Sequence, residues 1–454
     1  MQSPSGHPRT LKTLTVLLVL TLSIPCASAS TGLLDYVNAP DASFSWHRVS
    51  AGDSPAGPSY IISMTSQTWQ GIKWTHNIEF IKPRKCDYPG KAVLIITYGK
   101  PGDGSAKMAG IIAGVTGCPV AVLYDIPNQP LFDGLREDAL IAHTFARALE
   151  TRDLTWPLLL PMVKSAVRAM DVIQAFSKSE LGQEIDGFVV SGASKRGWTT
   201  WLTAAADPGR VKGIVPMVYD NLNLVAQMRH QIECWGAYGE EIRDYTQRGL
   251  QDTLETNDGK ALAQLVDPWS YQDKLTMPKL ILNGTNDPYW TQDALNIYWD
   301  ALRGPKFVTY IPNAGHNLRA GSGDTIEAVL TCAAFARAVV SQSPLPRMDW
   351  NYVQGNKARR LNITACPGMS DAKLWTATSD TLDFRGSTWR SSVMTRTEQD
   401  FTARFAYPVQ GYQAVYGSVS VPCGDRQSTL STQMCILSNK GPVRPLVGGK
   451  AMSK

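Results

Sequence analysis

The sequence predicts an α/β protein in which a mostly parallel sheet is flanked by helices and a smaller domain of strands follows. Short runs that are apolar on both faces alternate with helical patterns through residues 92–340. Such runs are typical of parallel strands, because helices cover both faces of the sheet they form. Beyond about residue 342 the pattern changes to short alternating segments separated by Gly, Pro, Asp and Ser, which indicates a β-sandwich.

Length and composition limit the classes of protein to consider. The chain has 454 residues, more than one ordinary domain, so we expect two domains. Hydrophobic residues make up 43% of it, which is enough for a large core and excludes global disorder. The net charge is only +5, with positive and negative residues interspersed, so nucleic acid is not the expected partner.

Residues 1–29 have the pattern of an export signal. Arg9 and Lys12 precede a short apolar stretch, and Ala27-Ser28-Ala29 offers small residues for cleavage. We therefore expect an exported protein, periplasmic or secreted, with no stable membrane span after cleavage. In an oxidising compartment we expect some of the remaining seven cysteines to pair. Cys332, within an apolar run, is expected to be a buried free thiol, and the other six could form three disulfides whose pairing the sequence does not fix.

The main domain is expected to cover residues 30–342. Residues 31–90 form a β-rich lead-in, with a hairpin over 59–80 that turns at Gln70-Gly71. The apolar runs predict strands at 92–97, 119–124, 187–191, 213–218, 279–282 and 307–311, and the periodic segments predict helices at 136–149, 158–176 and 324–340. Strand–helix alternation of this kind favours right-handed crossovers.

Three further segments complete the expected organisation. The insertion at about 220–277 is longer than a crossover needs, so we expect a helical lid. Residues 347–440 are expected to form an immunoglobulin- or fibronectin-like sandwich, and residues 441–454 a disordered tail. The stretch GKPGDGSAKMAG lacks the spacing of a phosphate loop and is expected to be a flexible loop.

The strongest local signal is the segment GFVVSGASKRGWTTWLTAA. An apolar strand meets a helix at Ser194, and a sharp turn there would expose the hydroxyl at the N-terminus of the helix. The segment departs from G-x-S-x-G because Arg196 stands where glycine is usual and Gly197 follows it. The alternative interpretation is a plain strand–helix turn with a capping serine.

A nucleophilic serine needs a base and an acid, which follow it in the order Ser, acid, His in this kind of sheet. His316 follows an apolar strand in a Gly-containing loop, whereas His230 lies in the lid segment, where we expect a surface histidine. Asp287 ends the loop after the next-to-last strand and is the preferred acid, with Asp220 as the alternative. The expected oxyanion donors are the N–H of Lys195 and the segment at Tyr98 and Gly99.

The segments SGASKRGWTTWLTAAADP, YDNLNLVAQMRHQIECWGAYGEEIRDYTQRGL, LVDPWSYQDKLTMPKLILNGTNDPYW and YIPNAGHNL together resemble the PhoPQ-activated pathogenicity-related family, which includes autocrine proliferation repressor proteins. The resemblance runs from about residue 33 to about 435. It implies an exported α/β-hydrolase with a C-terminal sandwich, with Ser194, Asp287 and His316 as the matches to the family's triad. It also implies a link to virulence or to secreted growth-control signals.

Two functions are open at this point. The first is a serine hydrolase of esters or amides, peptides among them, that uses no metal and no cofactor, since HExxH and CxxC patterns are missing from the sequence. In such an enzyme, acidic and aromatic lid residues could hold a substrate amine, although a solvated helix face is the simpler interpretation. These lid residues are Glu233, Trp235, Tyr238, Glu240 and Glu241. The second is a non-catalytic secreted signalling or binding protein, in which the sandwich binds a protein or surface ligand.

Overall fold

The computed structural model describes residues 1–2, 32–319, 323, 325–355, 358–444, 446 and 448–450. The predicted export signal therefore lies almost entirely outside the described residues. Within the described part of the chain, no helix has both the length and the apolar character needed to cross a bilayer.

The central feature is one long mixed sheet whose strands run in the order β1-β2-β3-β5-β4-β6-β7-β8-β9 through the main domain. Strands β5, β4, β6, β7, β8 and β9 are parallel to one another, and β1, β2 and β3 are antiparallel. The bounds are β1 Ser45–Ser54, β2 Gly57–Trp69, β3 Ile72–Ile81, β4 Lys91–Ile96, β5 Val120–Leu123, β6 Gly187–Ala193, β7 Val211–Met217, β8 Lys279–Gly284 and β9 Lys306–Ile311. This order, with its single crossing of β4 and β5, is that of the α/β-hydrolase fold, as predicted.

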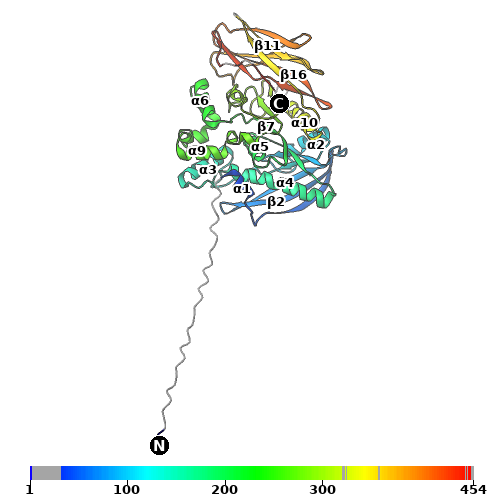
Figure 1. Cartoon of the computed structure of the whole chain (residues 1–454), viewed down its shortest axis with the longest axis vertical. Coiled ribbons are helices and arrows are strands. Elements are labelled where there is room, and N and C mark those ends of the chain that lie inside the picture. The colour runs from blue at the N-terminus through cyan, green and yellow to red at the C-terminus, as the bar shows by residue number, and fades with distance from the viewer. Residues whose placement is uncertain are drawn as a thin grey trace.

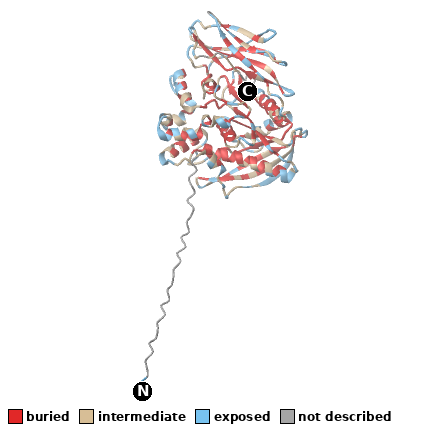
Figure 2. Cartoon of the chain, in the orientation of Figure 1, coloured by how far each residue is buried: buried red, intermediate tan, exposed pale blue. Residues whose placement is uncertain are grey.

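Helices cover the sheet and fill the connections between its strands (Figure 1). They are α1 Leu33–Asn38, α2 Gly104–Thr116, α3 Glu137–Thr151, α4 Leu159–Leu181, α5 Lys195–Ala206 and α10 Ile326–Val340. All six predicted core strands, the hairpin and the three predicted helices are present, with ends shifted by a few residues. Figure 2 shows that the buried residues concentrate on the central strands and on the helices packed against them.

One expectation about the loops is wrong. The glycine-rich stretch after β4 is not a flexible loop, because residues 104–116 form α2. The side chain of Asp103 caps its N-terminus by accepting a hydrogen bond from the Ser105 N–H at 2.7 Å. Alanine and isoleucine side chains on α2 are buried, and burial of that face outweighs the low helix propensity of glycine.

The segment between β7 and β8 consists of short helices joined by turns. It contains α6 Leu224–Trp235, η1 Glu240–Ile242, α7 Arg243–Thr246, α8 Leu250–Thr253, α9 Asn257–Val266 and η2 Pro268–Lys274. A further short 3-10 turn, η3 Ala294–Ile297, follows β8. Trp198 of α5 donates to the Val266 carbonyl at 2.6 Å, so the base of this segment is fixed to the helix that follows Ser194.

The C-terminal strands form two packed sheets, and one of them continues the main sheet. Strand β17 pairs with β9 and is followed in space by β16, β12 and β13, with β18 and β19 beside β16. The second sheet has the order β14-β15-β11-β10-β20. The bounds are β10 Asp349–Gln354, β11 Ala358–Thr364, β12 Ser370–Ser379, β13 Arg390–Val393, β14 Thr395–Arg396, β15 Asp400–Ala406, β16 Tyr412–Cys423, β17 Arg426–Ser431, β18 Cys435–Ser438, β19 Gly441–Pro442 and β20 Gly448–Lys450.

Two expectations for the end of the chain and for the cysteines differ from the structure. Residues 441–442 and 448–450 pair with β18 and β10, so this part of the predicted disordered tail is ordered. Cys332 is a buried free thiol as predicted, but the other six cysteines are also free thiols rather than disulfides. Most of them lie inside the fold, where burial raises the pKa of Cys118 to about 12 and that of Cys423 to about 12.

Candidate active site

Ser194 lies at the corner between β6 and α5, in a strained backbone conformation with φ 58° and ψ −123°. The corner closes tightly because two glycines allow it. A Cβ on residue 192 would lie 2.6 Å from the Arg196 carbonyl oxygen, and one on residue 197 would lie 2.7 Å from the Met217 carbonyl oxygen. The strand and the helix therefore approach closely enough to present the serine hydroxyl above the sheet.

The three predicted triad residues come together at the carboxyl ends of their strands. His316 Nε2 lies 2.8 Å from Ser194 Oγ, and His316 Nδ1 lies 2.8 Å and 3.0 Å from the two oxygens of Asp287. Asp287 is 3% exposed, whereas the His316 side chain is 22% exposed and can be reached from solvent. The Asp287 carboxylate also accepts the Tyr289 N–H at 2.9 Å, which fixes its orientation.

The alternative acid, Asp220, does not contact His316. It is fully buried and accepts hydrogen bonds from Asn283, at 2.8 Å, and from the Tyr298 hydroxyl. Burial is the main cause that raises its pKa to about 7, and the nearby Asp287 and Asp293 carboxylates add to the effect. Asp220 is thus part of the core beside the site rather than the partner of the histidine.

Of the predicted oxyanion donors, Lys195 follows Ser194 directly and Tyr98 lines a cavity with it, whereas Gly99 does not. Lys195 is the first residue of α5, where a helix leaves its N–H groups without intrahelical partners. Tyr98 lines a cavity together with Ser194 and His316, and its ring lies 4.8 Å from the Arg196 guanidinium. Gly99 does not line this cavity, and a Cβ at this position would clash with the Asp103 side chain.

The charged residues after Ser194 are held by two carboxylates on α3 that the sequence reasoning missed. Arg196 makes a bidentate contact with Glu137, at 2.7 Å and 2.5 Å, and donates to the Ile126 carbonyl. Lys195 Nζ lies 2.5 Å from Asp138, which also accepts from the Tyr245 and Tyr289 hydroxyls. Burial alone would raise the pKa of Glu137, but the hydrogen bonds and charge of Arg196 hold it below its usual range.

Tyr289 is a second residue that the sequence reasoning missed. Its ring stacks on the His316 imidazole, with centroids 4.1 Å apart and planes at 28°. It follows Asp287 by two residues, so its closeness to the predicted acid was the available signal. The stacked ring limits the rotation of the imidazole and shields one of its faces from water.

Of the five lid residues predicted to hold a substrate amine, Glu241 acts on the site from outside the cavities: after burial and the charge of Asp138, its charge also raises the pKa of Tyr289. None of them lines either of the two cavities that include Ser194. Glu240 pairs with Arg243 and Glu233 pairs with Arg444, both at the surface. Trp235 stacks against the Arg385 guanidinium, 4.1 Å from the ring centroid, in a contact between the lid and the C-terminal strands.

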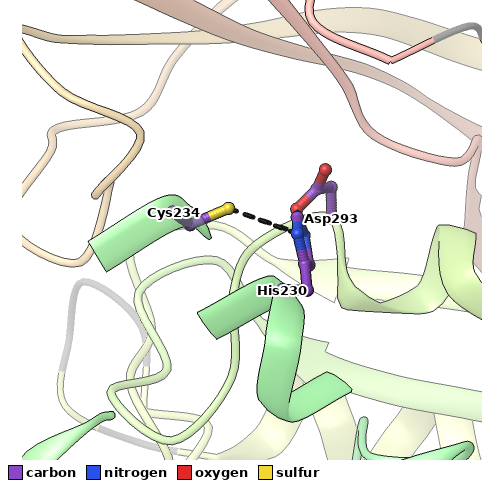
Figure 3. Close-up of side chains that lie close together, drawn as sticks. All are labelled: His230, Cys234 and Asp293. Atoms are coloured by element: carbon purple, nitrogen blue, oxygen red, sulfur yellow. Dashed lines mark hydrogen bonds and ion pairs between the residues drawn. The ribbon is translucent and has the colours of Figure 1, made fainter. Parts of the chain in front are cut away.

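His230 is 2% exposed and belongs to a buried polar cluster, so the expectation of a surface histidine is wrong (Figure 3). Its Nε2 lies 2.6 Å from Asp293 Oδ1, its ring lies 3.4 Å from Cys234 Sγ, and Arg444 donates to its Nδ1 at 2.6 Å. His, Cys and Asp are metal-ligand types, and their ligand atoms lie within 4.8 Å of one another. However, both ring nitrogens are engaged, and one of them accepts from a guanidinium whose charge would repel a metal ion. These contacts therefore fit a structural hydrogen-bond network better than a metal centre.

Comparison with known proteins assigns the chain to a family. Residues 33–385 match the family model described as PhoPQ-activated pathogenicity-related protein. The chain belongs to this family. It is also 33% identical over 397 residues to autocrine proliferation repressor protein A of Dictyostelium discoideum, an alignment that covers 82% of this chain and 79% of that protein.

Two of the solved structures with a similar fold are esterases of low sequence identity. Acetyl xylan esterase 1 from Thermoanaerobacterium sp. is 18% identical with a TM-score of 0.45, covering 66% of this chain and 90% of the esterase. An acetyl xylan esterase from Paenibacillus sp. R4 is 14% identical with a TM-score of 0.46, covering 63% and 86% of the two chains. The fold assignment of this family member rests on its own strand order.

Proposed function

We propose that this family member is an exported serine hydrolase that cleaves ester or amide bonds through an acyl-enzyme. The observation that carries the proposal is the continuous hydrogen-bonded chain from Ser194 Oγ through His316 to Asp287. A serine hydroxyl is a weak nucleophile until a base accepts its proton, and this chain supplies both the base and the group that orients it.

The proposed reaction has two halves. Ser194 Oγ attacks the substrate carbonyl carbon while His316 Nε2 takes its proton, and the Lys195 N–H and the Tyr98 segment stabilise the oxyanion. The tetrahedral intermediate collapses, and His316 gives the proton to the leaving alcohol or amine. Water then attacks the acyl-enzyme, with its proton passing through His316, and the acid product leaves as Ser194 is restored.

Labelling with a fluorophosphonate probe tests the proposal directly. We expect the wild-type mature protein and the surface variant Ser179→Ala to be labelled, and Ser194→Ala and His316→Ala to remain unlabelled. Asp287→Asn should slow labelling by about 10³- to 10⁴-fold, because the imidazole loses the carboxylate that holds its tautomer. A folded wild-type protein that is not labelled, or a Ser194→Ala variant labelled at the wild-type rate, would contradict the proposal.

A second function is motivated by the printed name of the Dictyostelium relative, which describes a repressor of proliferation. A secreted signal could act by binding alone, with the hydrolase core as a scaffold. Under that alternative, the Ser194→Ala variant would keep the full biological activity of the secreted protein. Loss of that activity together with labelling would assign the role to catalysis.

A further inference from the structure

Two cavities of different character meet at Ser194. One lies under the helical segment between β7 and β8, and its walls include Phe145, Trp198, Tyr219 and Trp290 from the main domain. Leu224, Met228, Leu254 and Leu262 close it from the lid side. The other opens beside His316 and Asn317 and is lined by Tyr98, Arg196 and Asn286.

The cavity under the lid has no free charge among its described lining residues. Its only charged residues are Asp138 and Lys195, and these pair with each other at 2.5 Å. The Asp138 carboxylate also accepts from two tyrosine hydroxyls, so with Lys195 three of its about four acceptor sites are used. A charged substrate group would lose its hydration in this cavity and find no counter-charge, which disfavours an ammonium or a carboxylate there.

The position of His316 decides which part of the substrate enters which cavity. The imidazole must reach the leaving-group oxygen to protonate it, and His316 lines the second cavity but not the one under the lid. The leaving group therefore departs on the side of His316 and Asn317. The acyl group, on the other side of the reacting carbonyl, faces the aromatic cavity.

The geometry points to an acyl pocket under the lid that selects uncharged apolar acyl groups, with an aryl-alkanoyl group as the best fit to its aromatic walls. The inference rests on the proposed function, which it makes more specific. The stacked pair Trp198 and Tyr219, with centroids 5.0 Å apart, and Trp290 at the edge of Tyr219 provide ring faces and edges for such a group. The acyl pocket gives the inner face of the lid a role in substrate binding, whereas the acidic residues on the outer surface of the lid have none.

A series of methyl esters with one leaving group tests the pocket. We expect kcat/KM to rise about 10- to 100-fold from methyl acetate to methyl 3-phenylpropanoate, the gain from burying a phenyl group. The kcat/KM for methyl 3-aminopropanoate should be lower than that for methyl acetate, because its ammonium has no partner in the cavity. Equal values for all three esters, or a preference for the charged one, would overturn the inference.

A cavity-filling variant locates the effect. Ala263 on α9 lines the cavity, whereas its neighbour Gln264 is exposed and does not. Ala263→Phe should lower kcat/KM for methyl 3-phenylpropanoate at least 10-fold and change that for methyl acetate less than threefold. Gln264→Phe should leave both unchanged, and an equal loss for both esters in Ala263→Phe would count against the pocket.

Binding to the Ser194→Ala variant separates this inference from the proposed function. Calorimetric titration should show tighter binding of methyl 3-phenylpropanoate than of methyl acetate, and the difference should vanish in Ser194→Ala/Ala263→Phe. If that pattern is found while folded wild type is not labelled by the fluorophosphonate probe, the pocket stands and the catalytic proposal falls. If wild type hydrolyses the esters without this pattern in binding, the catalytic proposal stands and the pocket falls.

Discussion

The residues around Ser194 show how a departure from the usual serine-corner motif is accommodated. Arg196 stands where a glycine is common, and its guanidinium is held by Glu137 and by the Ile126 carbonyl. Gly192 keeps the first glycine position of the motif, and Gly197 supplies the second close approach one residue later than usual. The second glycine of the motif is therefore displaced by one residue without loss of the geometry that exposes the hydroxyl.

Asp220 gives a residue-scale prediction about pH. Its pKa is raised from 3.8 to about 7 by burial, so the folded protein binds a proton there that the unfolded chain releases. The wild-type protein consequently loses stability as pH rises from about 4 to about 7, by up to about 4 kcal/mol, and this loss is constant above pH 7. Asp220→Asn removes the titration, and its amide can still accept from Tyr298.

We expect urea unfolding to show that Asp220→Asn gains stability relative to wild type between pH 5 and pH 8. The Asn283 amide can adapt to the new side chain, because its Oδ1 has no hydrogen-bond partner among the described residues. A control at Asp300, which is exposed, should show no such trend as Asp300→Asn. A stability difference between Asp220→Asn and wild type that does not change with pH would refute the expectation.

The site residues were predictable to the extent that chain order constrains them. Ser194, Asp287 and His316 follow the order and the strand ends that the fold requires, so sequence reasoning could select them before their contacts were known. Glu137 and Asp138 could not be selected in this way, since they lie on a helix far earlier in the chain. Their roles depend on side-chain packing across the sheet, which no local spacing encodes.

At the scale of elements, the fold was predictable where periodicity and burial agree. The central strands are apolar on both faces because both faces are covered, and this pattern is visible in sequence. Helix α2 was missed because its glycines indicate a loop. The burial of His230 was missed because we expected the outer face of its helix to be exposed to solvent. That face is covered by Arg444 from the end of the chain, so its burial depends on a contact distant in sequence.

The loops that carry Asp287 and His316 are both held by the connection between β12 and β13. Asn286, next to Asp287, donates to the carbonyls of Arg385 and Ser387 at 3.0 Å and 2.7 Å. Asn313, three residues before His316, exchanges two hydrogen bonds with the Trp389 backbone at 3.0 Å and 2.7 Å. The connection between β12 and β13 therefore braces the loops that bear Asp287 and His316.

The brace gives an element-scale prediction. Asn313 has φ 56°, so Asn313→Gly keeps the backbone conformation while removing both contacts to Trp389. We expect kcat for a small ester to fall about 10-fold with KM changed less than threefold. A less well positioned His316 slows the chemical step on bound substrate but does not change how the substrate binds. Steady-state kinetics measures both values.

A matched control separates positioning from general destabilisation. Gln342 has a similar φ of 54°, is exposed and lies far along the chain from the loops of the triad. Gln342→Gly should leave both kinetic constants near wild type. An unchanged kcat in Asn313→Gly, or an equal loss in Gln342→Gly, would show that the contacts to Trp389 do not position the histidine.

On the scale of the whole molecule, the main domain and the C-terminal strands share one sheet and one core rather than forming two separate domains. Strand β17 pairs with β9, and Tyr310 N–H donates to Ser431 Oγ at 3.1 Å next to this pairing. A single cluster of buried side chains runs from the hydrolase sheet into the sandwich. Figure 1 shows the C-terminal strands seated directly over the central elements, with the lid helices α6 and α9 to one side.

A shared sheet and core predict cooperative unfolding of the described domains. Removing the sandwich would expose the edge of β9 and the apolar surface beneath it, so we expect no intermediate with a folded hydrolase and an unfolded sandwich. In guanidinium, tryptophan fluorescence, far-UV circular dichroism and fluorophosphonate labelling should therefore give one coincident midpoint. Two separated transitions, with labelling retained after the first, would show instead that the hydrolase part stands on its own and that its loops do not need the brace from β12 and β13.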